Sequence, residues 1–184
     1  MALQGKKVAF VVAKEGIEQA ELVEPWNALR ESGAQPILVS ENRGQVQAFD
    51  HLDKADLFDV DVTLADASAA DFDALMLPGG VANGDEVRTL PAAVALVRAF
   101  ADAGKPIGVI CHGGWVLIEA GVVKGRMLTS WPSLATDYRN AGANWVDEQV
   151  VVDDGSFTLV SSRKPADLRA FNREFLDAVS GEVQ

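Results

Sequence analysis

The residues most capable of chemistry stand side by side, since the only cysteine, Cys111, is followed directly by His112, one of two histidines. They lie in the stretch KPIGVICHGGWVLIEAG (105–121), between an apolar run and two glycines. A thiolate is a strong nucleophile, and a helix N-terminus favours the thiolate over the thiol. Hydrolases hold nucleophiles at such strand-to-helix elbows. We therefore predict that Cys111 is a nucleophile; the plain alternative is a small core cysteine.

Histidine exchanges protons near neutral pH, so His112 is a candidate acid or base. Adjacent residues at a turn point in different directions, and a contact between the two side chains does not follow from their adjacency. A single cysteine excludes an internal disulfide and any multi-cysteine zinc or iron–sulfur site. With only two histidines, we expect no metal site and no cofactor.

The elements that must position this pair alternate between two patterns. Short apolar runs predict buried strands, and segments with apolar residues at helical spacing predict helices. The alternation predicts a flavodoxin-like, doubly wound α/β sandwich with a mostly parallel sheet, in one domain spanning residues 1–184. The predicted strands are 7–13, 35–40, 72–80 and 105–111, the main predicted helices are 16–33, 90–104 and 164–181, and a small hairpin is expected within 41–70.

Sites in such folds form beyond the carboxyl ends of the strands, so the loop after the first strand is a candidate. It reads AKEGIEQAE (13–21), and its carboxylates would repel a flavin phosphate. A carboxylate beside a thiolate shares a proton with it, because like charges raise each other's pKa. We assign this role to Glu18, at the expected loop-to-helix junction. Glu21 and Glu24 fit the acidic first turn of a helix.

A second candidate loop, PGGVANGDEVRT (78–89), follows the strand that should neighbour the cysteine strand. The backbone N–H groups of Gly79 and Gly80 suit an oxyanion hole, although a plain tight turn needs the same residues. Asp85 and Glu86 follow, and either carboxylate could orient a histidine. The loop therefore predicts two further groups for a cysteine site.

Composition excludes several classes of partner. The formal net charge of −11 repels phosphate backbones, so we expect no nucleic acid partner. No apolar run reaches the roughly 18 residues that span a bilayer, so we expect no membrane partner. The lysines before the first apolar run faintly mimic a signal peptide, but that run is short and an acidic segment follows, which predicts a cytoplasmic protein.

Taken together, these loops resemble the ThiJ/PfpI superfamily, often labelled intracellular protease I, and within it the bacterial general-stress proteins of the PfpI type. The resemblance covers about residues 6–180. Its carriers are AKEGIEQAEL, ALMLPGGVAN, GVICHGGWVLIEAG, TSWPSLATDYRNAGANWVDE and SSRKPADL. Class I glutamine amidotransferases, in the same superfamily, need a histidine downstream of the cysteine, and no histidine follows His112.

The resemblance implies roles position by position. The nucleophilic cysteine of the family falls on Cys111, its neighbouring histidine on His112 and its loop glutamate on Glu18, with oxyanion donors near Gly80 and His112. The resemblance also implies that Asp85, with Glu86 as runner-up, reaches the histidine of a neighbouring subunit. That arrangement predicts a homodimer with the site near the subunit interface.

The expected activity is a cysteine-dependent enzyme of the stress response. Family members are described as proteases, glyoxalases and deglycases, which share thiolate attack on a carbonyl as their first step. We expect small carbonyl compounds or glycated proteins as substrates. An intracellular cysteine peptidase is the first alternative, and a non-enzymatic sensor of oxidative stress through oxidation of Cys111 is the second.

Overall fold

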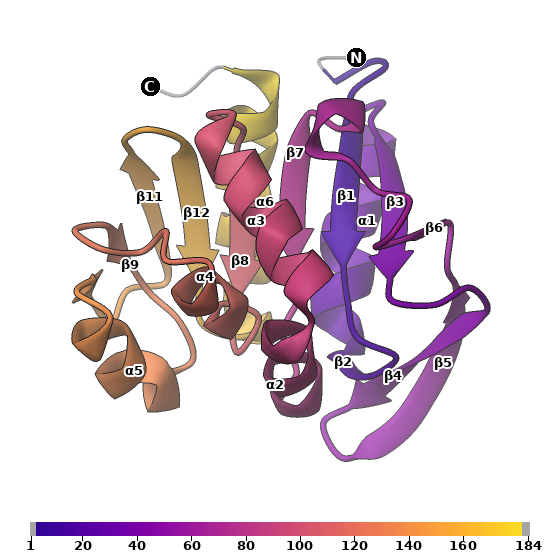
Figure 1. The fold of residues 1–184 in the computed structure, drawn as a ribbon, viewed down its shortest axis with the longest axis horizontal. Helices are drawn as coiled ribbons and strands as arrows, with labels where there is room; N and C mark the ends of the chain where they lie inside the picture. Colours follow the sequence, from indigo (N-terminus) through magenta and orange to yellow (C-terminus); the bar gives the residue numbers. More distant parts are fainter. Residues whose placement is uncertain (1–2, 182–184) are drawn as a thin grey trace.

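A seven-stranded sheet forms the centre of the computed structural model, which describes residues 3–181 (Figure 1). The strand order is β11-β12-β8-β7-β1-β3-β6. Every neighbouring pair is parallel except the hairpin of β11 and β12, which confirms the predicted mostly parallel, doubly wound sheet. The strands are β1 (Lys7–Val11), β3 (Gln35–Ser40), β6 (Val62–Thr63), β7 (Ala74–Leu77), β8 (Ile107–Ile110), β11 (Val150–Asp154) and β12 (Thr158–Ser162).

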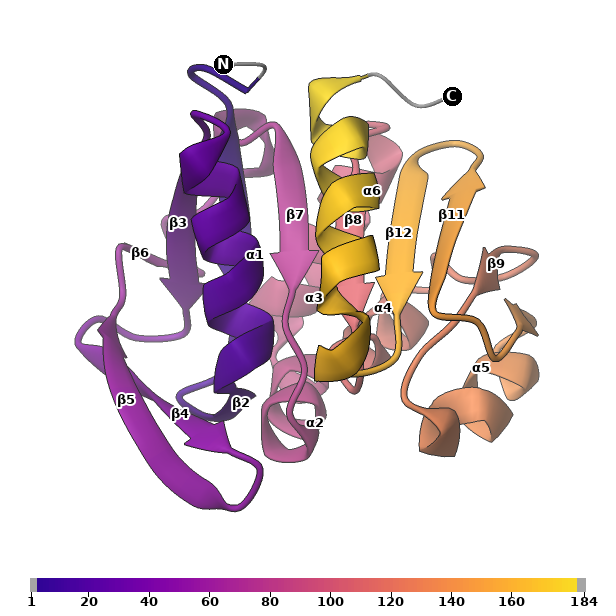
Figure 2. The same cartoon turned by 180° about the vertical axis from the view of Figure 1, so that it is seen from behind.

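Helices cover both faces of this sheet. The helices α1 (Gln19–Glu31) and α6 (Leu168–Ser180) lie on one face, and α3 (Pro91–Asp102) lies on the other (Figures 1 and 2). Each face of the sheet has its own hydrophobic core, and alternate residues of β1 belong to one core or the other. Phe10 lies in the core beneath α1 and α6, and Val11 lies in the core beneath α3. Because both faces of the strand are buried, its sequence is apolar throughout.

The helix predicted over 16–33 begins later than expected. Its first residues form the strand β2 (Glu15–Glu18), which pairs in parallel with β4 (Gln45–Asp50). The strand β5 (Asp53–Asp59) pairs antiparallel with β4, which confirms the hairpin expected within 41–70. The edge of this hairpin offers backbone partners to residues 15–18, and Ile17 is fully buried, so tertiary pairing overrides a local start of the helix there.

The segment predicted as a loop after Pro-Gly-Gly is instead a helix, α2 (Val81–Thr89). Two of its residues are poor helix formers, Asn83 and Gly84, and both are buried against neighbouring backbone. The Asn83 side chain accepts a hydrogen bond from Ala13 N–H and donates to the carbonyls of Pro78 and Gly79. A Cβ on Gly84 would overlap the His112 carbonyl. Tertiary contacts with the cysteine loop therefore hold this helix in place.

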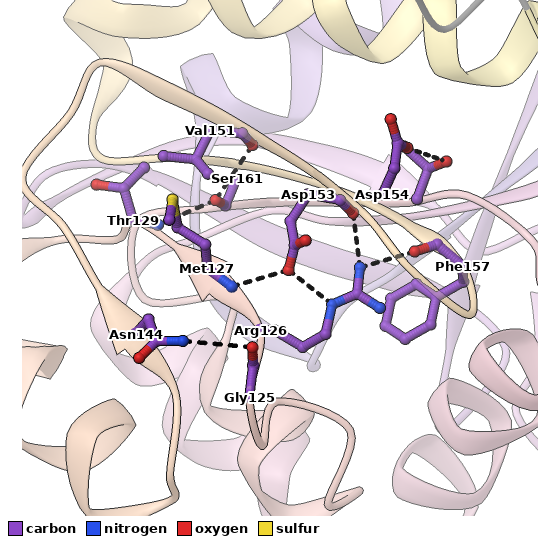
Figure 3. A network of polar contacts seen from close by, with 11 residues as sticks. Gly125, Arg126, Met127, Thr129, Asn144, Val151, Asp153, Asp154, Phe157 and Ser161 are labelled. Carbon is purple, nitrogen blue, oxygen red and sulfur yellow. Dashed lines mark hydrogen bonds and ion pairs between the residues drawn. The ribbon is translucent and has the colours of Figure 1, made fainter.

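The helix α4 (Trp115–Glu119) packs against α2 and α3, and three short 3-10 helices are Ala69–Asp71, Pro132–Leu134 and Pro165–Asp167. The end of the molecule beside β11 is formed by β9 (Met127–Leu128), α5 (Ala135–Asn140) and β10 (Asn144–Trp145). Figure 3 shows how Arg126, just before β9, joins this end to the β11–β12 hairpin through Asp153 and the Phe157 carbonyl. Within the described residues, no helix combines the length and apolar character needed to cross a bilayer.

Candidate active site

Cys111 lies at a sharp turn directly after β8. Its φ of +60° is in the left-handed region, which few residues other than glycine adopt. The turn is held from both sides, since Cys111 N–H donates to the Ser162 carbonyl at 3.1 Å and its own carbonyl accepts from Trp131 N–H at 3.3 Å. This strained backbone between β8 and α4 is the predicted strand-to-helix elbow, and the role of Cys111 as its nucleophile stays a prediction.

The two glycines after the elbow are required by packing. A Cβ on Gly113 would lie 2.5 Å from the carbonyl oxygens of Leu77 and Pro78, and one on Gly114 would overlap the Tyr138 hydroxyl. The cysteine loop can therefore lie directly against the Pro-Gly-Gly loop. This contact between two backbones is what brings the ends of β7 and β8 together around the thiol.

The carboxyl group that faces the thiol belongs to Glu21, so the assignment of this contact to Glu18 is wrong. Glu21 is fully buried, and its carboxyl interacts with the Cys111 thiol and the Gly79 N–H group. Neither oxygen has a hydrogen bond of standard geometry in the described chain, so these interactions are long or poorly aligned. Glu18 instead turns toward the hairpin, with Oε2 at 3.3 Å from the backbone nitrogen of His51.

The late start of α1 explains this difference. Because the helix begins at Gln19, Glu21 joins Pro25 and Leu29 on the buried stripe, at spacing i, i+4, i+8. Glu18 ends a strand. The sequence did contain a signal for Glu21, namely a carboxylate at the helical spacing of two apolar residues, although it was interpreted as an ordinary first-turn acid.

Burial changes the protonation of this pair. Burial, and secondarily the nearby Glu18 carboxylate, raise the pKa of Glu21 to about 8, so its carboxyl group keeps its proton at neutral pH. Burial and a charged Glu21 would also raise the pKa of Cys111, whereas the backbone N–H groups of Gly80 and His112 lower it. When Glu21 is protonated the repulsion is absent and its O–H can donate to the sulfur. The two groups therefore act as one acid that shares a proton.

The backbone N–H groups of the two predicted oxyanion glycines point to different partners. Gly80 N–H faces the sulfur of Cys111, together with His112 N–H, whereas Gly79 N–H faces Glu21. Gly80 has a φ of +95°, and a Cβ there would overlap the Gly16 carbonyl. The geometry thus places one of the two predicted donors beside the thiol. Its role toward an oxyanion stays a prediction.

His112 contacts the thiol within the same chain. Its Nδ1 lies 3.2 Å from Cys111 Sγ, and its Nε2 lies 3.3 Å from Ser133 Oγ. Burial lowers the pKa of His112, so the ring is neutral at neutral pH. If the Ser133 hydroxyl donates to Nε2, the ring proton is on Nδ1 and can stabilise a thiolate. The sequence pattern had not singled out Ser133, which reaches the site from a 3-10 helix 21 residues later.

A cavity of about 680 Å³ lies over these groups. It brings together Cys111, His112, Glu18, Glu21 and Gly80, and it also includes Asp85. Asp85 is exposed on α2, while Glu86 is half-buried and does not line the cavity. The contact of Asp85 with the histidine of a second subunit stays a prediction. The lining is completed by Glu15, Gly16, Phe49, His51, Leu52, Val81, Ala82, Trp115, Trp131 and Pro165.

One group of side chains at the rim has the donor set for a metal ion. Within residues 3–181, only Glu18, Asp50 and His51 bring three ligand atoms within 4.8 Å of one another. Carboxylate and imidazole ligands suit several divalent cations. From the sequence, no metal site is expected. The sequence alone does not identify this group, because Asp50 and His51 come beside β2 only when the β4–β5 hairpin pairs with that strand. Asp50 and His51 are exposed, and exposed acidic groups of this kind are common in proteins where no metal ion binds.

Comparison with known proteins gives one consistent result. The model of the DJ-1/PfpI family matches residues 6–178. "Deglycase PfpI" of Pyrococcus furiosus is 41% identical over 170 residues, which cover 92% of this chain and 97% of that protein. "General stress protein 18" of Bacillus subtilis is 38% identical over 172 residues, covering 94% and 96% of the two chains. "Protein/nucleic acid deglycase 2" of Escherichia coli is 37% identical over 171 residues, covering 93% and 96%.

Solved structures agree with the fold. The structure of DJ-1beta from Drosophila melanogaster superposes with a TM-score of 0.82 at 28% identity, covering 96% of this chain and 91% of that one. DJ-1 from Schizosaccharomyces pombe superposes with a TM-score of 0.80 at 23% identity, covering 93% and 90%. The similarity therefore extends over nearly the whole of each chain.

Proposed function

Because the chain belongs to the DJ-1/PfpI family, we propose that it is a cysteine-dependent enzyme that removes small carbonyl adducts from glycated substrates. The observation that supports this most directly is the placement of Cys111 at a strained elbow, in contact with the buried carboxyl of Glu21 and with His112. Three of the relatives named above support the choice of reaction, since two are called deglycases and one a general stress protein.

The geometry suggests how the first step proceeds. The Cys111 thiolate adds to the carbonyl carbon of the adduct, and the carbonyl electron pair moves to the oxygen, which the N–H groups of Gly80 and His112 can stabilise. The protonated Glu21 then supplies a proton and later takes one back. For an adduct of methylglyoxal with an amine or thiol, the overall reaction consumes one water and releases lactate and the free amine or thiol.

Replacement of the nucleophile tests this proposal. Cys111→Ser should lower the turnover of a methylglyoxal adduct by about 10³-fold or more, because a serine hydroxyl in this site lacks the nucleophilicity of a thiolate. Turnover is measured as lactate release, with Thr89→Ser, a similarly small change on the exposed end of α2, as the matched control. Full turnover by Cys111→Ser would contradict the proposal.

The buried carboxyl also supports a second candidate function, oxidation sensing. A protonated Glu21 can donate a hydrogen bond to a sulfinate formed on Cys111, which would stop further oxidation at that stage. Mass spectrometry after mild peroxide separates the two functions. Rapid gain of two oxygens at Cys111 without turnover of any adduct would favour the sensor.

A homodimer is part of the proposed enzyme. Asp85 is exposed at the rim of the cavity, where a carboxylate of a second copy could approach the site. Trp131, on the same rim, retains 38% of its surface exposed, as expected of an aromatic side chain available for a subunit contact. The proposed substrates are small carbonyl compounds and glycated proteins.

A further inference from the structure

The cavity over Cys111 has a strongly one-sided charge. Glu15, Glu18 and Asp85 contribute carboxylates to its wall, and the described residues that line it include neither lysine nor arginine. His51, also on the wall, lies 3.4 Å from the Glu18 carboxylate through its Nδ1. A cleft with walls of one charge sign concentrates ligands of the opposite sign.

Lys14 and Lys54 adjoin residues of the lining without lining the cavity themselves, and three further cationic side chains do not line it either. Arg88 lies over the Trp115 ring, with Cζ 5.5 Å from the ring centroid, and donates to the Glu119 carboxylate. Arg163 is held by two carboxylates, those of Asp147 and Asp167. Lys164 lines a separate hollow that shares Trp131 with the cavity. Two of these cations are already paired, and none of the three lines the cavity.

Part of the lining of this cavity is aromatic and apolar. Trp131 stacks on His112 with ring centroids 5.8 Å apart and stays 38% exposed, and Leu52 at the rim is 93% exposed. Phe49, the strand partner of Glu18, and Trp115 are also part of this lining. A planar cation on an apolar stem fits such a combination, because the stem packs on the rings while the charge faces the carboxylates.

We propose that this cavity selects carbonyl adducts carried on a cationic side chain, above all the guanidinium of arginine, over adducts on neutral thiols and over anionic carbonyl compounds. The preference comes from Glu15, Glu18 and Asp85 acting together on the charge of the ligand. A volume of about 680 Å³ accommodates a single modified side chain. The chemistry of the adduct rests on the proposed function, whereas the charge preference concerns binding alone.

Binding of two unreactive probes tests the preference without turnover. Nα-acetyl-L-arginine amide and Nα-acetyl-L-citrulline amide have nearly the same shape and differ in charge. The wild-type protein should bind the arginine amide about fivefold more tightly in calorimetry at low salt, and the difference should shrink as salt is added. Equal affinities, including no measurable binding of either probe, would overturn the inference.

A charge-neutralised variant identifies the source of the preference. In Glu15→Gln/Glu18→Gln/Asp85→Asn the two probes should bind equally. Asp102→Asn, which removes one charge at the exposed end of α3 outside the cavity, should keep the wild-type difference. If the triple variant is unstable, the three single variants should each reduce the difference. Unchanged selectivity in the triple variant, or in all three single variants, would overturn the assignment to these carboxylates.

Turnover separates this inference from the proposed function. Methylglyoxal adducts of the arginine amide and of N-acetylcysteine amide are compared by kcat/KM, and the arginine adduct should be favoured by a similar factor. If no adduct is turned over but the arginine amide binds preferentially, the proposed function fails and the charge preference stands. If both adducts are turned over equally and both probes bind equally, the charge preference fails and the proposed function stands.

Discussion

Two regions near opposite ends of the sheet contain buried ionisable side chains. The regions differ in the polar partners that these side chains have. At the carboxyl end of β8, Glu21 faces a thiol and a backbone N–H group, and no cation among residues 3–181 contributes to the shift of its pKa. At the amino end of β12, Arg126 donates through Nε to Asp153 at 2.8 Å and lies 4.3 Å over the Phe157 ring (Figure 3). The Asp153 carboxylate also accepts from Met127 N–H.

This difference separates the candidate active site from a structural ion pair. A buried carboxyl without a counter-charge keeps its proton at neutral pH, and that proton is available to the neighbouring thiol. The pairing of Asp153 with the Arg126 guanidinium, together with its hydrogen bond from Met127 N–H, holds β9 to the β11–β12 hairpin. The fully buried Glu21 without a counter-charge is thus a candidate acid, whereas the half-buried Asp153 is fixed in an ion pair.

The largest expected effect comes from breaking the ion pair. Arg126→Met should lower the free energy of unfolding by about 3 kcal/mol, because Asp153 loses its partner in a largely buried place. Urea denaturation measures this effect. Arg173→Met, an exposed arginine that pairs with its neighbour Glu174, is the control and should change stability little. Equal losses in the two variants would show that Arg126 is no more important than a surface arginine.

A substitution at Glu21, in the candidate active site, should raise the free energy of unfolding, whereas Arg126→Met lowers it. Between pH 4.5 and about 8 the folded protein keeps the Glu21 proton while the unfolded chain has lost it, so this group lowers stability as the pH rises through that window. Glu21→Gln removes this dependence and should stabilise the protein by about 2 kcal/mol at neutral pH. The stabilisation should nearly vanish at about pH 4.5.

Glu21→Gln should at the same time lower turnover by about 100-fold, because the amide cannot exchange a proton with the substrate. Chemical denaturation and lactate release, each measured as a function of pH, check both effects. Glu24→Gln, an exposed acid on the same helix, is the matched control. A Glu21→Gln variant that is destabilised at every pH would contradict the description of Glu21 as a buried neutral acid.

The smallest effect concerns the hydroxyl that orients His112. Ser133→Ala should lower kcat by about fivefold and change stability little, because Nε2 loses its partner and the ring proton is no longer held on Nδ1. The pH profile of thiol alkylation should shift to higher pH, since the thiolate loses a donor. Ser133→Thr restores the hydroxyl and should recover most of the activity. An unchanged alkylation profile in Ser133→Ala would remove Ser133 from the site.

Much of the fold could be predicted because its signals are local. Buried parallel strands such as β1 and β7 are short apolar runs, and α3 and α6 carry apolar residues at helical spacing. The helix α2 could not be predicted, because Asn83 and Gly84 are poor helix formers. They are accommodated by their contacts with Ala13 and with the His112 carbonyl, which lie in other loops. Tertiary contacts of that kind leave no periodic pattern in the sequence.

The candidate site was predictable in part for the same reason. Cys111 and Gly80 follow strands whose carboxyl ends must meet at one edge of a parallel sheet. The choice between Glu18 and Glu21 depended on where α1 begins, and that start is determined by the pairing of β2 with a hairpin about 30 residues later in the chain. A shift of three residues exchanges a carboxylate at the rim for one in the core.

By itself, the sequence determined the alternation of the main strands and helices, the position of Cys111 at a strand end and the excess of acidic side chains. These features depend on hydrophobic periodicity and residue type, which act over a few neighbouring residues. Only the tertiary structure decided that Glu21 meets the thiol, that Ser133 holds His112 and that three carboxylates share one cavity. Each of these depends on the distance between segments far apart in the chain, which packing of the whole sheet sets.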